Sequence, residues 1–195
     1  MRGLRGTLNH DDVVQTMDAQ HGALFGCIEQ GRRSARWVAG SIRFAFKVDP
    51  EGQPTDVRAV ESDIGHHELE GCLTGVLSGT RFPQPAGRML TRDFFWGMSV
   101  EPAYREAEPM DAAELKKLLK KQSREVYKSC QLARRRNRYA VTAYVSPRGK
   151  ITSLGAVATR GKAKARAKLD CVLEQVASWK LPRVKRRSKV RFELR

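Results

Sequence analysis

Two stretches of the chain, CLTGVLSGTRFP at residues 72–83 and CVLEQVASWKLP at residues 171–182, decide how the fold is expected to be built. Each stretch contains a cysteine, an aliphatic run, a bulky residue near its end and a proline at the same offset from the cysteine. The same pattern at two places in one chain indicates an internal duplication, which assigns the neighbouring helices and strands to two equivalent units.

The features around these stretches return in the same order in both halves of the chain. Each half has a helical segment with a first cysteine (Cys27 or Cys130), an alternating run, and a tight turn, DPEG at residues 49–52 or SPRG at residues 146–149. A second strand, a second helix with the second cysteine and a last strand follow. The sequence therefore predicts the order helix, strand, strand, helix, strand twice, in units of about 90 residues.

The repeat divides the 195 residues into unit one (residues 1–100), a connector (residues 101–110) and unit two (residues 111–195). The net charge of +16 is distributed unevenly between them. Residues 1–100 contain 11 Lys and Arg against 12 Asp and Glu, whereas residues 101–195 contain 26 against 9, a balance of +17. The two units therefore present different surfaces, which indicates different partners or different parts of one partner.

The spacing of apolar residues predicts the individual elements. Asn9 and Asp111 are expected to cap the first helix of each unit, and the first helix of unit one is expected to bury Phe25. In unit one, alternation at residues 42–48 indicates a strand and helical spacing at residues 65–78 a second helix. The remaining segments are a last strand at residues 89–96 and, in unit two, a strand at residues 139–145, a helix at residues 162–180 and a strand at residues 190–194.

These elements predict an α+β fold of two tandem layered units. In each unit the apolar stripes of two helices are most simply buried against one face of a three-stranded antiparallel sheet. The other face of each sheet is expected to stay polar, and the sheet edges have to be charged, covered or used for binding.

The four cysteines recur as a pair in each unit, on or beside the inward face of two helices that must lie side by side. The repeat therefore selects the disulfides Cys27–Cys72 and Cys130–Cys171, which would place the protein in an oxidising compartment. One alternative is buried free thiols in a cytosolic protein. A zinc site at His66 and His67 with Cys72 is a weaker alternative, because the spacing does not bring the ligands to one helix face.

The segments around the cysteines, turns and prolines resemble the TonB-like C-terminal domain superfamily, and within it the AgmX/PglI-type C-terminal domains of bacterial envelope and gliding-motility proteins. The resemblance implies a periplasmic location and a role in joining inner-membrane machinery to outer-membrane or periplasmic proteins. It also implies that a partner's extended segment can add a strand to a sheet edge. The matching segments are GCIEQ (26–30), GSIRFAFKVDPEG (40–52), GCLTGVL (71–77) and RFPQPAG (81–87) in unit one, and YKSC (127–130), VSPRGKI (145–151) and DCVLEQVASWKLP (170–182) in unit two.

Unit two departs from this family pattern, since it lacks a glycine before its first strand and has KLPRVKRR where a glycine-containing turn is usual. Its partner is therefore not expected to be the family's usual one. The start of the chain, MRGLRGTLNHDD, has no apolar core of a secretion signal. A periplasmic protein would then be a region of a longer chain, whereas a complete chain would be cytoplasmic.

No catalytic, cofactor-binding or metal-binding residues are predicted. The segment GVLSGT at residues 75–80 lacks the lysine of a phosphate-binding loop and lies within an expected helix. The acidic pairs are explained as a helix cap and a solvated face, and no run of 18 apolar residues offers a membrane span. We therefore expect a protein that binds others and is not an enzyme.

The basic residues of unit two are the candidate partner-binding residues. They can bind an acidic protein, lipid headgroups or another anionic polymer, or they can form an ordinary solvated face. The leading hypothesis is a periplasmic adaptor with a near-neutral sheet edge on unit one and this basic surface on unit two. The alternative is a cytoplasmic nucleic-acid- or polyanion-binding module with reduced cysteines. The candidate residues are Arg134, Arg135, Arg136, Arg138, Lys185, Arg186, Arg187, Lys189 and Arg191.

Overall fold

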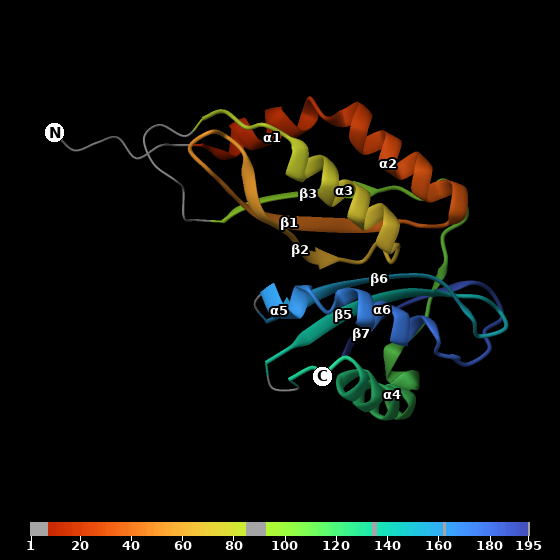
Figure 1. Cartoon of the computed structure of the whole chain (residues 1–195). Helices are drawn as coiled ribbons and strands as arrows, with labels where there is room; N and C mark the ends of the chain where they lie inside the picture. Colours follow the sequence, from red (N-terminus) through yellow and green to blue (C-terminus); the bar gives the residue numbers. More distant parts are fainter. Residues whose placement is uncertain (1–7, 85–92, 134–135, 162, 195) are drawn as a thin grey trace.

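The chain forms two β-sheets with helices against them, an α+β architecture seen in the computed structural model in Figure 1. The structure describes residues 8–84, 93–133, 136–161 and 163–194. In unit one the antiparallel sheet has the strand order β2-β1-β3, and in unit two the mixed sheet has the order β4-β7-β5-β6. The strands are β1 (Gly40–Val48), β2 (Pro54–Ser62), β3 (Phe94–Val100), β4 (Glu108–Pro109), β5 (Arg138–Val145), β6 (Ile151–Arg160) and β7 (Ser188–Leu194).

The three strands expected in each unit follow the same path. β1 lies between β2 and β3, as β5 lies between β6 and β7, and all four of these pairings are antiparallel. Unit two departs from the expected three strands, because the connector contributes β4 to its sheet. The last strand of unit one also runs later than expected, from Phe94 to Val100, and residues 89–92 of the expected strand lie outside the described part of the chain.

The first helix of unit one begins as predicted, with Asn9 as its cap. The Asn9 side chain accepts the Asp12 N–H at 2.8 Å, and the Asp12 carboxylate accepts the Asn9 N–H at 3.0 Å, a capping box that satisfies two free donors. The expected single helix is divided into α1 (His10–Asp18) and α2 (His21–Ser34). The expectation that Phe25 is buried is wrong, because its side of α2 faces solvent and Phe25 is 51% exposed.

The helix with the second cysteine in unit one is α3 (His67–Gly79), which packs beside α2 over the sheet (Figure 1). Leu69, Leu73 and Leu77 of α3 are buried against Phe44 and Phe46 of β1 in one apolar cluster. The alternation predicted for β1 therefore supplies the floor of this core, and α3 supplies its cover.

The repeated pattern ends in the same contact in both units. In unit one the Phe82 N–H donates to the carbonyl of the turn residue Gly52 at 2.9 Å, and in unit two the Leu181 N–H donates to the carbonyl of Gly149 at 2.9 Å. Both glycines have positive φ angles, +83° and +80°, and a Cβ on either would collide with the carbonyl of that same partner. The glycine of each turn is therefore needed for the close approach of the residue before the proline.

In unit two, Asp111 accepts the Ala113 N–H at 2.8 Å and caps η1 (Ala112–Leu115), which leads into α4 (Lys116–Ser129). The helix expected over residues 162–180 is divided into α5 (Ala163–Arg166) and α6 (Leu169–Ala177). Trp179 lies after α6, where it is buried and stacks on Phe192 of β7 with the ring centres 5.7 Å apart.

Both predicted disulfides are present. Cys27 is bonded to Cys72 with Cα atoms 5.7 Å apart, and Cys130 is bonded to Cys171 with Cα atoms 5.8 Å apart. No cysteine is left as a free thiol or a zinc ligand, so those two alternatives are wrong. The disulfides indicate an oxidising environment, extracellular or periplasmic. Within the described ranges, no helix has both the length and the apolar character needed to cross a bilayer.

Candidate interaction surfaces

The outer face of the unit-two sheet, which was expected to be open and polar, is covered by unit one. Every residue of β5 from Tyr139 to Val145 is buried. Its side chains at Val141 and Ala143 pack under the helices of unit two, whereas Tyr144 belongs to the apolar core of unit one. The two units are therefore docked through the face of β5 and β6 that turns away from their own helices (Figure 1).

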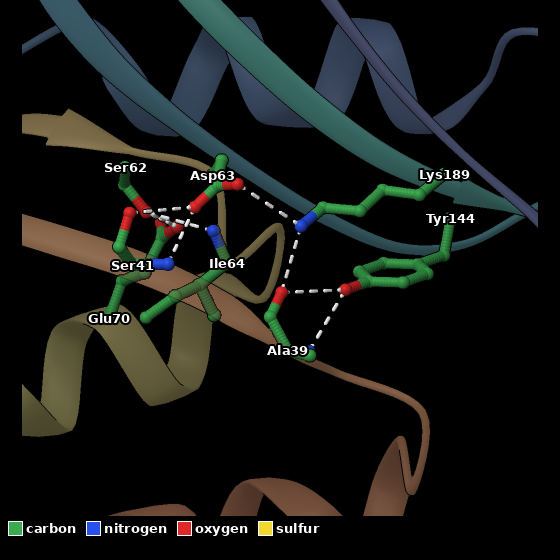
Figure 2. A network of polar contacts seen from close by, with 8 residues as sticks. All are labelled: Ala39, Ser41, Ser62, Asp63, Ile64, Glu70, Tyr144 and Lys189. Carbon is green, nitrogen blue, oxygen red and sulfur yellow. Dashed lines mark hydrogen bonds and ion pairs between the residues drawn. The ribbon is translucent and has the colours of Figure 1, made fainter. Parts of the chain in front are cut away.

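Tyr144 is the centre of the polar part of this contact, as Figure 2 shows. Its hydroxyl accepts the Ala39 N–H at 3.0 Å and donates to the Ala39 carbonyl at 3.0 Å. Burial raises the pKa of Tyr144 to about 12, so the hydroxyl keeps the proton that it donates. One side chain of unit two thus satisfies both backbone groups of a residue in unit one.

Lys189 of β7 crosses the same boundary from unit two. Its ammonium donates to the Ala39 carbonyl at 2.9 Å and lies 3.3 Å from the Asp63 carboxylate (Figure 2). Burial acts to raise the pKa of Asp63, but the Ser41 N–H and the Lys189 ammonium outweigh it and lower that pKa below its usual value. Lys189 of unit two therefore binds unit one through a hydrogen bond and an ion pair.

Glu70 of α3 is buried at this boundary beside the backbone of β6. Its carboxyl accepts the Ser62 hydroxyl at 2.6 Å, and burial raises its pKa to about 7 despite this bond and one from the Gly65 N–H. A Cβ on Gly155 of β6 would lie 2.5 and 2.7 Å from the two carboxyl oxygens. A larger residue at this position would require the Glu70 carboxyl to move.

The candidate basic residues do not form one surface. Arg187 stacks on Trp37 of unit one, with its guanidinium 3.3 Å from the ring centre, and Arg186 pairs with Glu108 of the connector at 3.1 Å. Antiparallel pairing places Arg138 at the end of the sheet opposite to Ser188. Of the other described candidates, Lys185 precedes β7, Arg191 is exposed in the middle of β7 opposite Thr142, and Arg136 and Arg138 lie toward the far end of the sheet. Arg134 and Arg135 lie outside the described residues.

The outer strands of the two sheets meet different neighbours. β2 and β6 contact each other across the boundary between the units. β7 is paired with β4, since the Glu108 N–H donates to the Arg187 carbonyl at 3.0 Å and the Met110 N–H to the Lys189 carbonyl at 2.8 Å. Among the strands of the described segments, none pairs with the outer side of β3. The connector therefore occupies, in unit two, the edge that corresponds to the open edge of unit one.

A groove of about 790 Å³ runs beside the open strand β3, between it and the helices α1 and α2. Phe95, Gly97 and Ser99 are exposed on one side of β3, while Trp96 and Met98 are half-buried on the side that faces the helices. The apolar residues that line the groove include Val14, Met17, Leu24, Ile42, Phe95, Trp96 and Met98, and the charged residues and histidines that line it are His10, Asp18, His21, Arg43 and Glu61.

The contact between the units and the pairing of β4 were not predicted from the sequence. A usable signal for the contact lies in β5, whose outer positions are Ala140, Thr142 and Tyr144, with no charge among them. By contrast, the outer positions of β1 include Arg43 and Lys47, which remain at the surface. An uncharged outer face on a central strand is typical of a strand that is covered on both sides.

Comparison with protein-family models, with curated proteins and with solved structures finds no match for this chain. Among the described residues, no group of three or more His, Cys, Asp or Glu side chains lies close enough together to hold a metal ion. The function therefore has to be inferred from the surfaces themselves.

Proposed function

We propose that this protein is a non-enzymatic adaptor that binds an extended segment of a partner protein as an additional strand on the outer edge of β3. The observation that carries the proposal is the difference between the two corresponding edges: β7 is paired with β4, whereas no described strand pairs with the outer side of β3. Unpaired N–H and C=O groups along a sheet edge are a template for another chain.

The connector illustrates the chemistry that the proposal requires. At β7, the chain's own residues 108–110 lie extended along the edge and donate two backbone hydrogen bonds to it. At β3, the same kind of backbone pairing would come from a partner, along residues 95–100. Backbone bonds of this kind supply affinity with little dependence on the partner's sequence, so selectivity has to come from side chains.

The groove between α1 and β3 supplies that selectivity. Alternate side chains of an added strand point to the same face as Trp96 and Met98, and they would enter a lining formed with Val14 and Met17 of α1. The proposed partner segment is therefore extended, with apolar residues at every second position. Its other face would lie near Arg43 and Phe95, which form a cation–π pair with the guanidinium 4.7 Å from the ring centre.

The identity of the fold and the cell compartment belong to this proposal. The helix and strand order and the two disulfides support tandem TonB-like domains of the AgmX/PglI type, in a periplasmic protein of a bacterial envelope, motility or transport complex. Protein isolated without reductant from the cells that naturally make it is expected to carry both disulfides. Four free thiols in that material would contradict the periplasmic location.

The experiment that tests strand addition is selection of binding peptides from a library of extended segments, followed by affinity measurement on two variants. Val14→Glu places a charge in the groove lining and is expected to weaken the selected peptides at least about tenfold, because an apolar side chain would then face an unpaired carboxylate. Phe25→Glu is the matched control, since Phe25 is exposed on α2 and does not line the groove. Equal affinities for the two variants would refute the proposed groove.

A further inference from the structure

Unit two contains a second hollow, at the end of its sheet where β5 begins and β6 ends. It has a volume of about 890 Å³, and its described lining comes from residues 131–133 and 136–137 on one side and residues 160–161, 163–165 and 168 on the other. Four cationic side chains line it, and no described acidic side chain does. The cations are Arg136, Arg160, Lys164 and Lys168.

The hollow lies in a part of the sequence that is rich in Lys and Arg. Between Glu125 and Asp170 the sequence has 12 Lys and Arg and no acidic residue. The neighbouring Arg166 turns to Asp56 of unit one and pairs with it at 2.5 Å, whereas none of the four lining cations forms an ion pair with a described carboxylate. Arg138 and Arg160 also lie opposite each other in the β5–β6 ladder, a like-charged pairing that costs stability unless an anion lies nearby.

Buried tyrosines fix the walls of the hollow. The Tyr127 hydroxyl donates to the Asn137 carbonyl at 2.6 Å, and the Tyr139 hydroxyl donates to the Ala165 carbonyl at 3.0 Å. Both rings are buried in the core of unit two. The two segments that carry the cations are therefore held to the core, and the site does not have to be assembled when a ligand arrives.

The rest of the lining identifies the ligand class. The other lining residues include Leu132, Ala133, Ala163 and Ala165, which give the hollow an apolar surface between its cations. No aromatic residue lines it, so nucleic-acid bases would have no stacking platform there. The disulfides indicate an oxidising compartment, in which membranes present phosphate groups.

We propose that this hollow binds the phosphate group of an anionic membrane lipid, with the glycerol and first methylene groups against its apolar surface. The Arg and Lys side chains neutralise the phosphate, and unit two is thereby placed on the membrane surface. This proposal locates one contact of the basic unit and does not depend on strand addition at β3. Together, the two sites would hold a partner segment at a membrane.

The test is cosedimentation of the full chain with phosphatidylcholine vesicles that contain or lack phosphatidylglycerol. The double variant Arg160→Gln/Lys164→Gln is expected to lose about 30-fold in affinity for the anionic vesicles, on the basis of the attraction of each cation near an anionic surface. The matched control is Lys117→Gln/Lys121→Gln, which removes the same charge from exposed positions on α4 and is expected to change affinity less than about threefold.

Equal losses in the two double variants would overturn the proposal, because binding would then depend on net charge alone; no loss in either would also overturn it. Glycerol phosphate is expected to compete with the vesicles for the wild type. A single-stranded oligonucleotide that binds more tightly than the anionic vesicles, and loses that binding in Arg160→Gln/Lys164→Gln, would replace the lipid with nucleic acid. Peptide binding at β3 is measured on the same variants and is expected to be unchanged, which separates failure of this site from failure of the adaptor function.

Discussion

Replacement of Glu70 by Gln tests the contact between the two units through its pH dependence. The folded protein has a Glu70 pKa of about 7, against an ordinary value of 4.5. Each pKa unit corresponds to about 1.4 kcal/mol, so ionisation of Glu70 costs the folded state on the order of 3 kcal/mol. Because the folded pKa is raised, the carboxyl contributes fully at pH 4 and loses that contribution as the pH rises through 7.

The expected result for Glu70→Gln follows from that sign. At pH 4 the Glu70 carboxyl of the wild type is neutral in the folded state and mostly neutral in the unfolded state, and the amide is a close substitute for it. At pH 8 the variant avoids the cost of a buried charge. Relative to the wild type, the unfolding free energy of the variant is therefore expected to increase by about 3 kcal/mol between pH 4 and pH 8. Titration of groups that do not interact with Glu70 cancels in this difference.

The measurement is urea unfolding of both proteins across this pH range. Glu68→Gln is the matched control for removal of an exposed carboxylate from the same first turn of α3. Because Glu68 also acts on the pKa of His66, its difference from the wild type is expected to change with pH, but by less than that of Glu70→Gln. A difference for Glu70→Gln that changes by less than about 0.5 kcal/mol would refute the burial of this carboxyl against β6.

Three further changes test the fold. Cys27→Ala/Cys72→Ala opens a loop with a sequence separation of 45 and is expected to cost about 4 kcal/mol in urea unfolding; retention of wild-type stability would contradict a closed disulfide. Tyr144→Phe leaves the Ala39 N–H without its partner and is expected to cost about 1–3 kcal/mol in thermal unfolding, whereas an unchanged midpoint would show that the units are not docked through this hydroxyl. Gly155→Ala places a methyl group 2.5 Å from the Glu70 carboxyl and is expected to cost about 1–3 kcal/mol and to speed proteolysis of the connector; proteolysis at the wild-type rate would contradict the close approach.

The repeated features of the sequence predicted what each unit contains. The residue before the repeated proline makes the same contact in both units, Phe82 with Gly52 and Leu181 with Gly149. The paired cysteines form the two disulfides. Asn9 and Asp111 cap their helices as expected. These features depend on local chemistry and on the pairing of equivalent positions, so a comparison of the two halves is enough to find them.

The differences between the units were harder to predict. Apolar residues recur at helical spacing over residues 162–180, but the structure has two helices there, α5 and α6, which are separated near Lys168. Lys168 makes no side-chain capping bond and is not a helix-breaking residue, so the sequence contains no sign of this break. The pairing of β4 depends on only two connector residues, too few to produce a strand pattern. Lys189 was expected to contact a partner, whereas its neighbours Ala39 and Asp63 come from the far half of the chain. Contacts between residues so far apart in the sequence produce no periodic pattern of apolar residues from which they could be predicted.

Hydrogen exchange along β3 is the most direct test of strand addition. In the complex with a selected peptide, amide hydrogens within Phe94–Val100 are expected to exchange more slowly than in the free protein, because a strand beside β3 would bond the outward-pointing N–H groups. Exchange within β7, which is already paired with β4, is expected to stay the same. Peptide binding that leaves exchange in β3 unchanged, or that slows exchange only in other strands, would contradict the proposal that β3 is the binding edge.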